Sequence, residues 1–545
     1  VRIFQVQPDG TKDYKIAILP IPSVLDRIIE VPSSSNKVHR FVYLEDVISY
    51  YAIQFFQGYG IEESMIFRLT RDADLEIDEE DAKDLLTEVE ASLRRRRRGD
   101  AVRLEVVGAG SPELLRTVLA SVELEEKDVY HIDGHLDCRM YFDFSNYPGY
   151  DNLRYKPFEP KIPSDLIGFE GENLLDVIRN RDIFVHHPFE SFSVVEQFVA
   201  QAAVDSNVLA IKQTLYRVSG ESPIIASLIK AADNGKQVTV LMEVKARFDE
   251  EHNITMARRL EKAGCHVIYG LKGLKTHSKI TMVVRREEDG IRRYVHLATG
   301  NYNGKTARIY TDCGIFTCND EYGDDASRFF NLISGYSDPP IWNKFIVAPL
   351  NLRERIMDLI DEEIQCAKRG EDAYIIAKMN SLLDKKVIAK LYEASANGVR
   401  IDLIVRGICT LRPGIAGVSD NITVRSIVGR FLEHHRLFYF RNGGNEKIFL
   451  SSADWMPRNL NERVELMIPI EDKRHKARIK GILDLYLVDT LKAHLMRSDG
   501  SYYKVSNIEG PLSAQEELME AANTQDSREQ MTVIERFKPM FKMKE

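Results

Sequence analysis

The sequence predicts an α/β multidomain protein, with an α+β section at the N-terminus followed by two homologous α/β halves packed face to face. At 545 residues the chain is too long for one core, since domains usually hold about 100–200 residues. From about residue 164, strand-like and helix-like segments alternate, which is typical of parallel strands joined by helical crossovers. The same order of segments recurs roughly 150 to 170 residues later.

The first section, residues 1–163, combines strands with helices. "AVRLEVV" (101–107) predicts a strand, and "SPELLRTVLASV" (111–122) predicts a capped helix. The five consecutive arginines Arg94–Arg98 indicate either a solvated helix end or a phosphate-binding rim. The stretch 146–166 is rich in Pro, Gly and Tyr, which favours an irregular connection to the next domain.

The first α/β half is predicted over residues 164–345. "NVLAIKQTLY" indicates a buried strand and "QVTVLMEV" the next one. Between them lies a helix with Ser222 at its N-cap, Pro223 at its first position and Gly235 past its end. This strand–helix–strand order predicts a parallel pair with a helical crossover.

The second half, residues 346–510, repeats the first. "DAYIIAKMNSL" resembles "NVLAIKQTLY", and "KKVIAKLYEASANGVRIDLIVRG" resembles "IIASLIKAADNGKQVTVLMEVKAR". Later, "EHHRLFYF" matches "THSKITMV", and "FLSSADWM" matches "HLATGNYN". Four features in the same order indicate two copies of one domain, and residues 511–545 are expected to form a charged C-terminal tail.

The repeat gives the histidines their context. His277 stands between Lys275 and Lys279 where a loop enters a strand, and His434 is its counterpart. Two halves facing each other would bring both rings to one cleft, lined by cationic side chains: Lys275, Lys279, Arg247, Arg406 and Arg436. Such a cleft suits a phosphate substrate, and its charge lowers the imidazole pKa, so that a ring nitrogen stays free to attack.

Composition limits the remaining possibilities. The net charge of −9 argues against a general nucleic-acid binder, although a cleft can still be locally basic. No run of 18 uncharged apolar residues is present, so no membrane span is predicted. The six Cys are scattered, which favours reduced thiols in a cytoplasmic enzyme.

The H-x-K motif followed by a G-N-x-N or S-x-D turn, present twice, resembles the phospholipase D superfamily. The resemblance implies two paired histidines, one a nucleophile and one an acid or base. That family's pattern is HxKxxxxD, however, and Val284 stands at the position of its Asp, while Arg436 replaces the second Lys. The sequence therefore argues against a simple phosphodiesterase.

Nearly the whole chain resembles type-1 polyphosphate kinase. The most specific stretches are "LKTHSKI", "ATGNYNGKTARIYTDCG", "RSIVGRFLEHHRLFYF" and "SSADWMPRN", together with the long segment "IKQTLYRVSGESPIIASLIKAADNGKQVTVLMEVKARFDEEHNI". The resemblance implies reversible transfer of the ATP γ-phosphate to inorganic polyphosphate through a phosphohistidine. It also implies two phospholipase D-like catalytic domains after a head domain, and the family's N-terminal helical domain is expected to be absent from this chain.

The resemblance assigns roles to individual residues. His277 is the expected nucleophile, and His434 the acid, base or stabiliser that also contacts ATP. Tyr310 and Arg406 are the expected ATP contacts. Arg217 and Arg247 match the magnesium-phosphate site, where a guanidinium without a lone pair would hold phosphate oxygens rather than the ion.

From the residues themselves, Lys275, Lys279 and Arg436 are expected to bind phosphate. Asn301 and Asn303 either orient His277, bind phosphate or form a turn. Asp312 and Glu465 occupy matching places and could each hold the far ring nitrogen of a histidine.

The expected cofactor is Mg²⁺, and the expected partners are ATP/ADP, inorganic polyphosphate and a second copy in a homodimer or homotetramer, without nucleic acid. The expected location is the cytoplasm, with peripheral attachment to the inner membrane as an alternative. Two other functions compete: a phospholipase D-like phosphodiesterase or nuclease, and a non-catalytic scaffold that binds polyanions.

Overall fold

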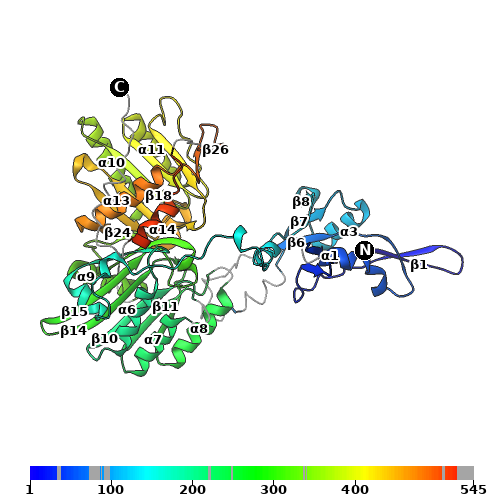
Figure 1. Ribbon diagram of the computed structural model, residues 1–545, viewed down its shortest axis with the longest axis horizontal. Helices are drawn as coiled ribbons and strands as arrows, with labels where there is room; N and C mark the ends of the chain where they lie inside the picture. The colour runs from blue at the N-terminus through cyan, green and yellow to red at the C-terminus, as the bar shows by residue number, and fades with distance from the viewer. Residues whose placement is uncertain are drawn as a thin grey trace. The chain divides into compact units, whose positions relative to one another are not determined.

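The computed structural model describes residues 1–33, 38–72, 86, 89–90, 99–218, 222–246, 249–335, 338, 340–505 and 510–524. Arg94–Arg98 and Arg247 lie outside the described residues. The chain divides into two compact units, drawn in Figure 1: Val1–Glu76 with Ala91–Lys156, and Ile77–Glu90 with Pro157–Glu545.

The first unit is α+β. Its strands form three small sheets: β2 (Lys12–Ile16), β1 (Arg2–Val6) and β5 (Gly60–Glu63); β3 (Ile28–Val31) and β4 (Arg40–Tyr43); β6 (Phe67–Arg71), β7 (Ala101–Val107) and β8 (Val129–Ile132). Its helices are α1 (Leu44–Tyr50), α3 (Pro112–Val122) and α4 (Met140–Phe144). α3 begins as the sequence predicts, because Ser111 Oγ accepts a hydrogen bond from the backbone N–H of Leu114 at 3.2 Å.

The second unit opens with a mixed sheet whose strands run in this order: β12 (His266–Tyr269), β11 (Gln237–Met242), β10 (Val208–Leu215), β14 (Ile280–Glu287), β15 (Gly290–Ala298) and β16 (Tyr310–Thr317), with β9 (Ile183–His187) also on β16. The first three strands are parallel, and β14 to β16 continue antiparallel. The helices of this half are α5 (Leu174–Asn180), α6 (Ser193–Val204), α7 (Pro223–Asp233), α8 (Glu250–Lys262) and α9 (Asp320–Ile333).

A second sheet repeats that order: β20 (Ile422–Ile427), β19 (Arg400–Val405), β18 (Tyr374–Met379), β22 (Arg436–Phe440), β23 (Lys447–Ser451) and β24 (Arg463–Ile470), with β17 (Ile346–Ala348) on β24. Two strands extend it beyond β20, namely β25 (Ala493–Met496) and β26 (Tyr502–Lys504). Its helices are α10 (Leu352–Lys368), α11 (Lys385–Ala396), α12 (Pro457–Asn461) and α13 (Lys473–Leu487). The identical strand order confirms the internal repeat.

One buried core joins the two halves. It combines Met282 and Val295 of the first sheet with Leu437 and Leu450 of the second, and it includes apolar side chains of α9 and α13. Figure 1 shows α9 and α13 in the region where the two sheets of this unit approach each other. The predicted fold class, an α+β section followed by two homologous α/β halves packed face to face, is confirmed.

The halves also exchange short strands. β13 (Lys275–Thr276) leaves the first half and pairs in parallel with β24 of the second. β21 (Leu432–Glu433) leaves the second half and pairs in parallel with β16 of the first. Each exchanged strand ends directly before one of the two candidate histidines, so the exchange positions both of them.

The expected boundaries at residues 163, 345 and 510 stay predictions. Within the expected tail, residues 514–524 form helix α14 (Ala514–Thr524), and residues 525–545 lie outside the described residues. Gln515 of α14 donates a 2.8 Å hydrogen bond from Nε2 to the carbonyl of Phe431, next to β21. Among the described helices, none is both long and apolar enough to cross a membrane.

A buried carboxylate fastens the connection between the halves. Asp325 of α9 is fully buried and accepts hydrogen bonds from the backbone N–H groups of three successive residues: Asn343, Lys344 and Phe345. We expect Asp325→Ala to destabilise the second unit by about 3 kcal/mol, because buried donors lose their acceptor. Chemical denaturation would measure this change.

Asp324→Ala is the matched control on the same helix. Asp324 forms a surface ion pair with Arg293 at 3.0 Å, so its loss should change stability by less than about 1 kcal/mol. Equal effects of the two substitutions would contradict the role given to Asp325.

Candidate active site

The exchanged strands hold the backbone of both histidines. The N–H of His277 donates to the carbonyl of Val464 at 2.9 Å, directly after the β13–β24 pairing. The N–H of His434 donates to Oγ1 of Thr311 at 3.0 Å, directly after the β21–β16 pairing. Each histidine is therefore anchored by the half to which it does not belong.

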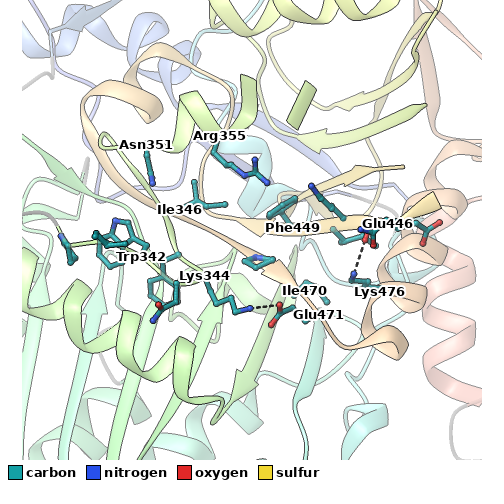
Figure 2. Close-up of a pocket in the computed structure, with 18 residues that line it drawn as sticks. Trp342, Lys344, Ile346, Asn351, Arg355, Glu446, Phe449, Ile470, Glu471 and Lys476 are labelled. Atoms are coloured by element: carbon teal, nitrogen blue, oxygen red, sulfur yellow. Dashed lines mark hydrogen bonds and ion pairs between the residues drawn. The ribbon is translucent and has the colours of Figure 1, made fainter. Parts of the chain in front are cut away.

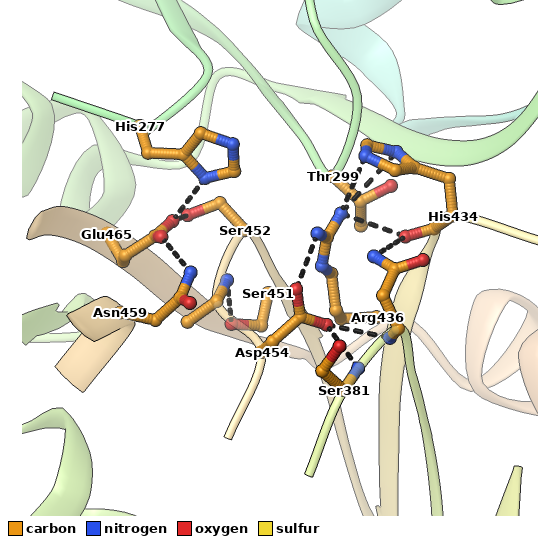
Figure 3. Close-up of polar contacts among 12 residues, drawn as sticks. His277, Thr299, Ser381, His434, Arg436, Ser451, Ser452, Asp454, Asn459 and Glu465 are labelled. Atoms are coloured by element: carbon orange, nitrogen blue, oxygen red, sulfur yellow. Dashed lines mark hydrogen bonds and ion pairs between the residues drawn. The ribbon is translucent and has the colours of Figure 1, made fainter. Parts of the chain in front are cut away.

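The ring of His277 is held by a carboxylate of the other half. Its Nδ1 lies 2.9 Å from Oε2 of Glu465, and Glu465 also accepts hydrogen bonds from Ser452 and Asn459 (Figure 3). A carboxylate that already has two donors favours the tautomer in which Nδ1 carries the proton. The lone pair of His277 is therefore on Nε2, and among the described residues none is hydrogen-bonded to that atom.

His434 repeats this arrangement with the halves exchanged. Its Nδ1 lies 2.8 Å from Oδ1 of Asp312, which also accepts a 2.7 Å hydrogen bond from Thr299. Asp312 belongs to the first half and His434 to the second. Both expected carboxylate partners are thus confirmed, but each histidine pairs with the carboxylate of the opposite half.

The basic residue two positions after each histidine turns back to that histidine's carbonyl. Lys279 Nζ donates to the carbonyl of His277, and Arg436 donates to the carbonyl of His434 at 2.8 Å. Arg436 does more, because its Nη1 lies 3.1 Å from Nε2 of His434 and its Nη2 donates to Asp454 at 2.9 Å (Figure 3). The same Nη1 lies 3.4 Å from Nδ1, and an atom nearly equidistant from both ring nitrogens lies over the face of the ring, so Arg436 places its charge against that face rather than on the in-plane Nε2 lone pair.

Electrostatics keep His277 neutral. Burial holds the pKa of its ring well below the usual range, and Lys279, Arg463 and Arg436 lower it further. His434 also contributes to this lowering, so the two rings lie within electrostatic range of each other. A neutral imidazole with a free nitrogen is the form that can act as a nucleophile.

His434 and its partner respond to opposite influences. Burial lowers the pKa of His434, while Asp312 raises it and Arg436 lowers it. For Asp312, burial would raise the pKa, but His434 and Arg436 hold it below its usual value. Asp312 is therefore ionised and can stabilise positive charge on the ring of His434.

Two residues beside His277 were missed by the sequence analysis. The ring of Tyr216 packs edge-on against His277, with centroids 5.1 Å apart. Arg463 precedes β24's Glu465 by two residues and lowers the pKa of His277. Tyr216 directly precedes Arg217 in the sequence, and Arg463 stands two residues before Glu465. Closeness in sequence to these candidate residues was the only signal that could have identified Tyr216 and Arg463 as part of the site.

The expected nucleotide contacts lie on the His434 side. Tyr310 begins β16, and its ring centroid is 5.2 Å from that of His434. Arg406 follows β19 and donates from Nε to the carbonyl of Glu433 at 3.2 Å and from Nη2 to Asn380 at 3.1 Å. Burial lowers the pKa of Arg406.

Other expected phosphate ligands are less tightly gathered. Burial lowers the pKa of Lys275 to about 8, so this side chain is a cation that can lose its proton near neutral pH. Arg217 follows β10, is about one-third exposed and pairs with Asp249 at 2.7 Å. The structure brings Lys279 and Arg436 to the histidines, whereas Cζ of Arg217 lies 6.0 Å from the ring centroid of Tyr216, the side chain that packs on His277.

The two asparagines of the G-N-x-N turn differ. Oδ1 of Asn303 accepts hydrogen bonds from the backbone N–H groups of Lys305 and Thr306, at 3.0 and 3.2 Å. Asn303 therefore stabilises the turn, the third of the alternatives left open. Oδ1 of Asn301 is buried without a hydrogen-bond partner in the described part of the chain, which leaves it available to a ligand.

Figure 2 shows a separate pocket of about 640 Å³ in the second unit, near Trp342 and Phe449. It contains none of the candidate residues. Its Lys344 pairs with Glu471 at 2.7 Å, and its Lys476 donates to the carbonyl of Glu446 at 2.9 Å. Because these cations are already engaged, the pocket is a weaker phosphate site than the region around the histidines.

The described carboxylates near His277 and His434 are not free to bind a metal ion directly. The described carboxylates there are each engaged by a cation, an imidazole or several donors: Asp312, Glu433, Asp454 and Glu465. Mg²⁺ prefers oxygen ligands and retains several waters. These residues do not fit a magnesium ion held by protein carboxylates alone.

Three family descriptions match the chain. They are "Polyphosphate kinase middle domain" at residues 2–144, "Polyphosphate kinase C-terminal domain 1" at residues 173–339 and "Polyphosphate kinase C-terminal domain 2" at residues 345–515.

Curated relatives agree with these matches. The polyphosphate kinase of Halalkalibacterium halodurans is 53% identical over 506 residues, which cover 92% of this chain and 71% of the relative. That of Bacillus anthracis is 53% identical over 496 residues, which cover 90% of this chain and 70% of the relative. The crystal structure of polyphosphate kinase from Porphyromonas gingivalis matches with a TM-score of 0.84 and 32% identity, covering 96% of this chain and 77% of that one.

The buried imidazoles predict a pH-dependent stability. Burial lowers the pKa of six described histidines: His186, His187, His277, His296, His434 and His435. Unfolding restores an ordinary pKa of about 6.5, so below that pH the unfolded chain binds protons that the folded chain does not. We therefore expect the thermal unfolding midpoint of the second unit to fall between about pH 7 and about pH 5.5.

Calorimetry at several pH values measures this slope. Replacing the exposed His266 by Gln should leave it unchanged. A midpoint that stays constant or rises toward pH 5.5 would show that the buried rings are not neutral in the folded protein.

Proposed function

The chain belongs to the polyphosphate kinase family, and from this premise we propose that it transfers the γ-phosphate of ATP reversibly to inorganic polyphosphate through a phosphohistidine at His277. ATP/ADP and polyphosphate are thus the proposed substrates. The observation that carries the proposal is the state of His277: Glu465 holds its Nδ1, burial and nearby cations keep the ring neutral by lowering its pKa, and its Nε2 has no hydrogen-bond partner among the described residues.

In the first step, Nε2 of His277 attacks the γ-phosphorus of ATP in line. The nitrogen–phosphorus bond forms as the bond from phosphorus to the β–γ bridging oxygen breaks, and ADP leaves with that oxygen. Phosphorylation leaves a cationic ring if Nδ1 keeps its proton, and Glu465 stabilises that charge through the Nδ1 hydrogen bond. A terminal oxygen of polyphosphate then attacks phosphorus, and the histidine is released.

Cations supply the electrostatic part of catalysis. A transferring phosphoryl group spreads negative charge over its equatorial oxygens, so catalysis depends mainly on positioning and on opposite charge. Lys279 and Arg436 are the nearest candidates, with Arg406, Lys275 and Arg217 further along the phosphate chain. Each such group is expected to lower the barrier by about 2–4 kcal/mol.

His434 serves the same reaction in one of two ways. It either exchanges a proton at the entering or leaving oxygen, or it stabilises the phosphohistidine by its charge. Its pairing with Asp312 supports both roles, because the carboxylate stabilises a protonated ring. Tyr310 is close enough to His434 to contact the nucleotide when that ring contacts its phosphates.

Magnesium is proposed to enter with the nucleotide. The engaged carboxylates near the histidines do not fit a direct protein site, and a guanidinium cannot donate a lone pair to the ion. Arg217 would therefore hold phosphate oxygens that also bind Mg²⁺. Arg247, expected in the same role, lies outside the described residues. A homodimer or homotetramer and peripheral contact with the inner membrane remain part of the proposal.

The position of the phosphate on the ring identifies the attacking nitrogen. Incubation with γ-labelled ATP should leave acid-labile, base-stable phosphate on His277, attached to Nε2, because Nδ1 is occupied by Glu465. Alkaline hydrolysis of the labelled protein followed by chromatography separates the two phosphohistidine isomers. His277→Ala should abolish the label, and the control His266→Ala at an exposed position should retain it.

Label on Nδ1, or label retained after His277→Ala, would place the nucleophile elsewhere. Release of choline or cleavage of DNA without exchange between ATP and ADP would instead favour a phospholipase D-like hydrolase. Binding of polyphosphate without any labelled histidine would favour a scaffold.

Glu465 orients His277 through Nδ1. Glu465→Gln keeps the shape but removes the charge that stabilises the phosphorylated ring, so the rate of phosphohistidine formation should fall by about 10²-fold. The KM for ATP should change little, since Glu465 contacts the ring and not the nucleotide. Rapid-quench single-turnover measurements separate these two effects.

Glu462→Gln is the matched control, because Glu462 lies three residues away and its side chain is exposed. It should leave the phosphorylation rate unchanged. An equal loss in both variants, or a loss confined to KM, would contradict the positioning role of Glu465.

A further inference from the structure

Three buried side chains gather behind His434 and take no part in the proposed phosphoryl transfer. They are His186, Cys313 and His435, and each is at most 1% exposed. Their potential ligand atoms all lie within 4.8 Å of one another. The group joins the two halves, because His186 and Cys313 belong to the first half and His435 to the second.

The sheet register produces this cluster. Cys313 of β16 is the direct partner of His186 on the antiparallel strand β9. On its other side β16 pairs in parallel with β21, where Thr311 faces Glu433. Residues two positions further along point to the same face, so Cys313 and His435 follow Thr311 and Glu433 side by side. Three neighbouring segments thus place three potential ligands, two imidazoles and one thiol, side by side.

The ring nitrogens of the cluster lack ordinary partners. Neither Nδ1 nor Nε2 of His435 makes a hydrogen bond of good geometry in the described part of the chain, although the backbone of Thr311 is near enough to raise the pKa of the ring, and Nε2 of His186 has no partner there either. The two rings meet edge to face, with centroids 5.4 Å apart. Buried polar atoms without partners cost free energy, so three in one cluster indicate a ligand that would satisfy them.

The surrounding charges permit a cation. A metal ion needs both imidazoles neutral and Cys313 deprotonated, because only those forms have a lone pair to give. The two nearby cations are each paired: Lys378 with Glu433 at 2.8 Å and Arg478 with Glu190 at 2.7 Å. Binding would release the Cys313 proton, and the resulting thiolate would offset part of the ion's charge.

We propose that His186, Cys313 and His435 form a structural site for a transition-metal ion of the zinc type. Two imidazoles and one thiolate are ligands that Zn²⁺ prefers, with a water or a further side chain completing four-fold coordination. Metal–ligand bonds of about 2.0–2.3 Å require the three side chains to close by small rotations. The ion would fasten β21 to β16 and so fix His434, the next residue along the chain.

The test uses the untagged chain produced in minimal medium with Co²⁺ in place of Zn²⁺. Absorption spectroscopy should show the near-ultraviolet thiolate-to-cobalt band and the visible bands of a tetrahedral site, and elemental analysis should give one ion per chain. Cys313→Ser should lose the thiolate band. The control Cys318→Ser, at a second buried cysteine just beyond β16, should keep it.

If Cys313→Ser does not fold, X-ray absorption at the zinc edge of the unmodified protein tests the site instead. The proposal expects one sulfur and two imidazole nitrogens around the ion. A folded chain without bound metal, a shell without sulfur, or a thiolate band that persists in Cys313→Ser would each overturn it. Phosphohistidine formation at His277 is measured separately, so either proposal can fail alone.

Discussion

The reciprocal exchange of β13 and β21 is the constraint on which the rest of the structure depends. Each of these two-residue strands leaves its own half, pairs with a strand of the other (β24 for β13, β16 for β21), and ends directly before a histidine. The receiving strand carries the carboxylate that holds that histidine. Neither half therefore contains a complete histidine–carboxylate pair, and the duplicated fold yields one site rather than two.

Such an arrangement needs electrostatic compensation. Burying an ion costs several kcal/mol unless it is paired, and the core beside the histidines holds Lys279 and Arg436 as well as Asp312 and Glu465. Asp312 and Glu465 each hold an imidazole, Arg436 pairs with Asp454, and Lys279 donates to a backbone carbonyl. Burial and the nearby cations lower the pKa of His277 and keep it neutral. A chain with a net charge of −9 can thus present a local site for a polyanion, because the field depends on nearby groups.

Whether the sequence could predict a contact depends on how far apart its two residues lie along the chain. The histidines and their basic neighbours stand at strand starts in two matching segments. The local sequence pattern was therefore sufficient to select them as candidate site residues. Asp312 and Glu465 were also predictable from their matching positions. Their crossed pairing was not, because β13 and β21 are too short to give a periodic pattern and their partners lie more than 100 residues away. Tyr216 reaches His277 for the same long-range reason.

The two copies differ where their chemistry must differ. A perfect repeat would give both rings the same free nitrogen, and either could react. Lys279 is a point donor that reaches the carbonyl of His277, whereas the planar guanidinium of Arg436 contacts the carbonyl and the ring face of His434 and also Asp454. Asp454 is the counterpart of Asn301 in the first copy, and its carboxylate holds the guanidinium of Arg436 in position. The change from lysine to arginine, together with that from asparagine to aspartate, therefore fixes a guanidinium against the ring of His434 and gives the two histidines different electrostatic surroundings.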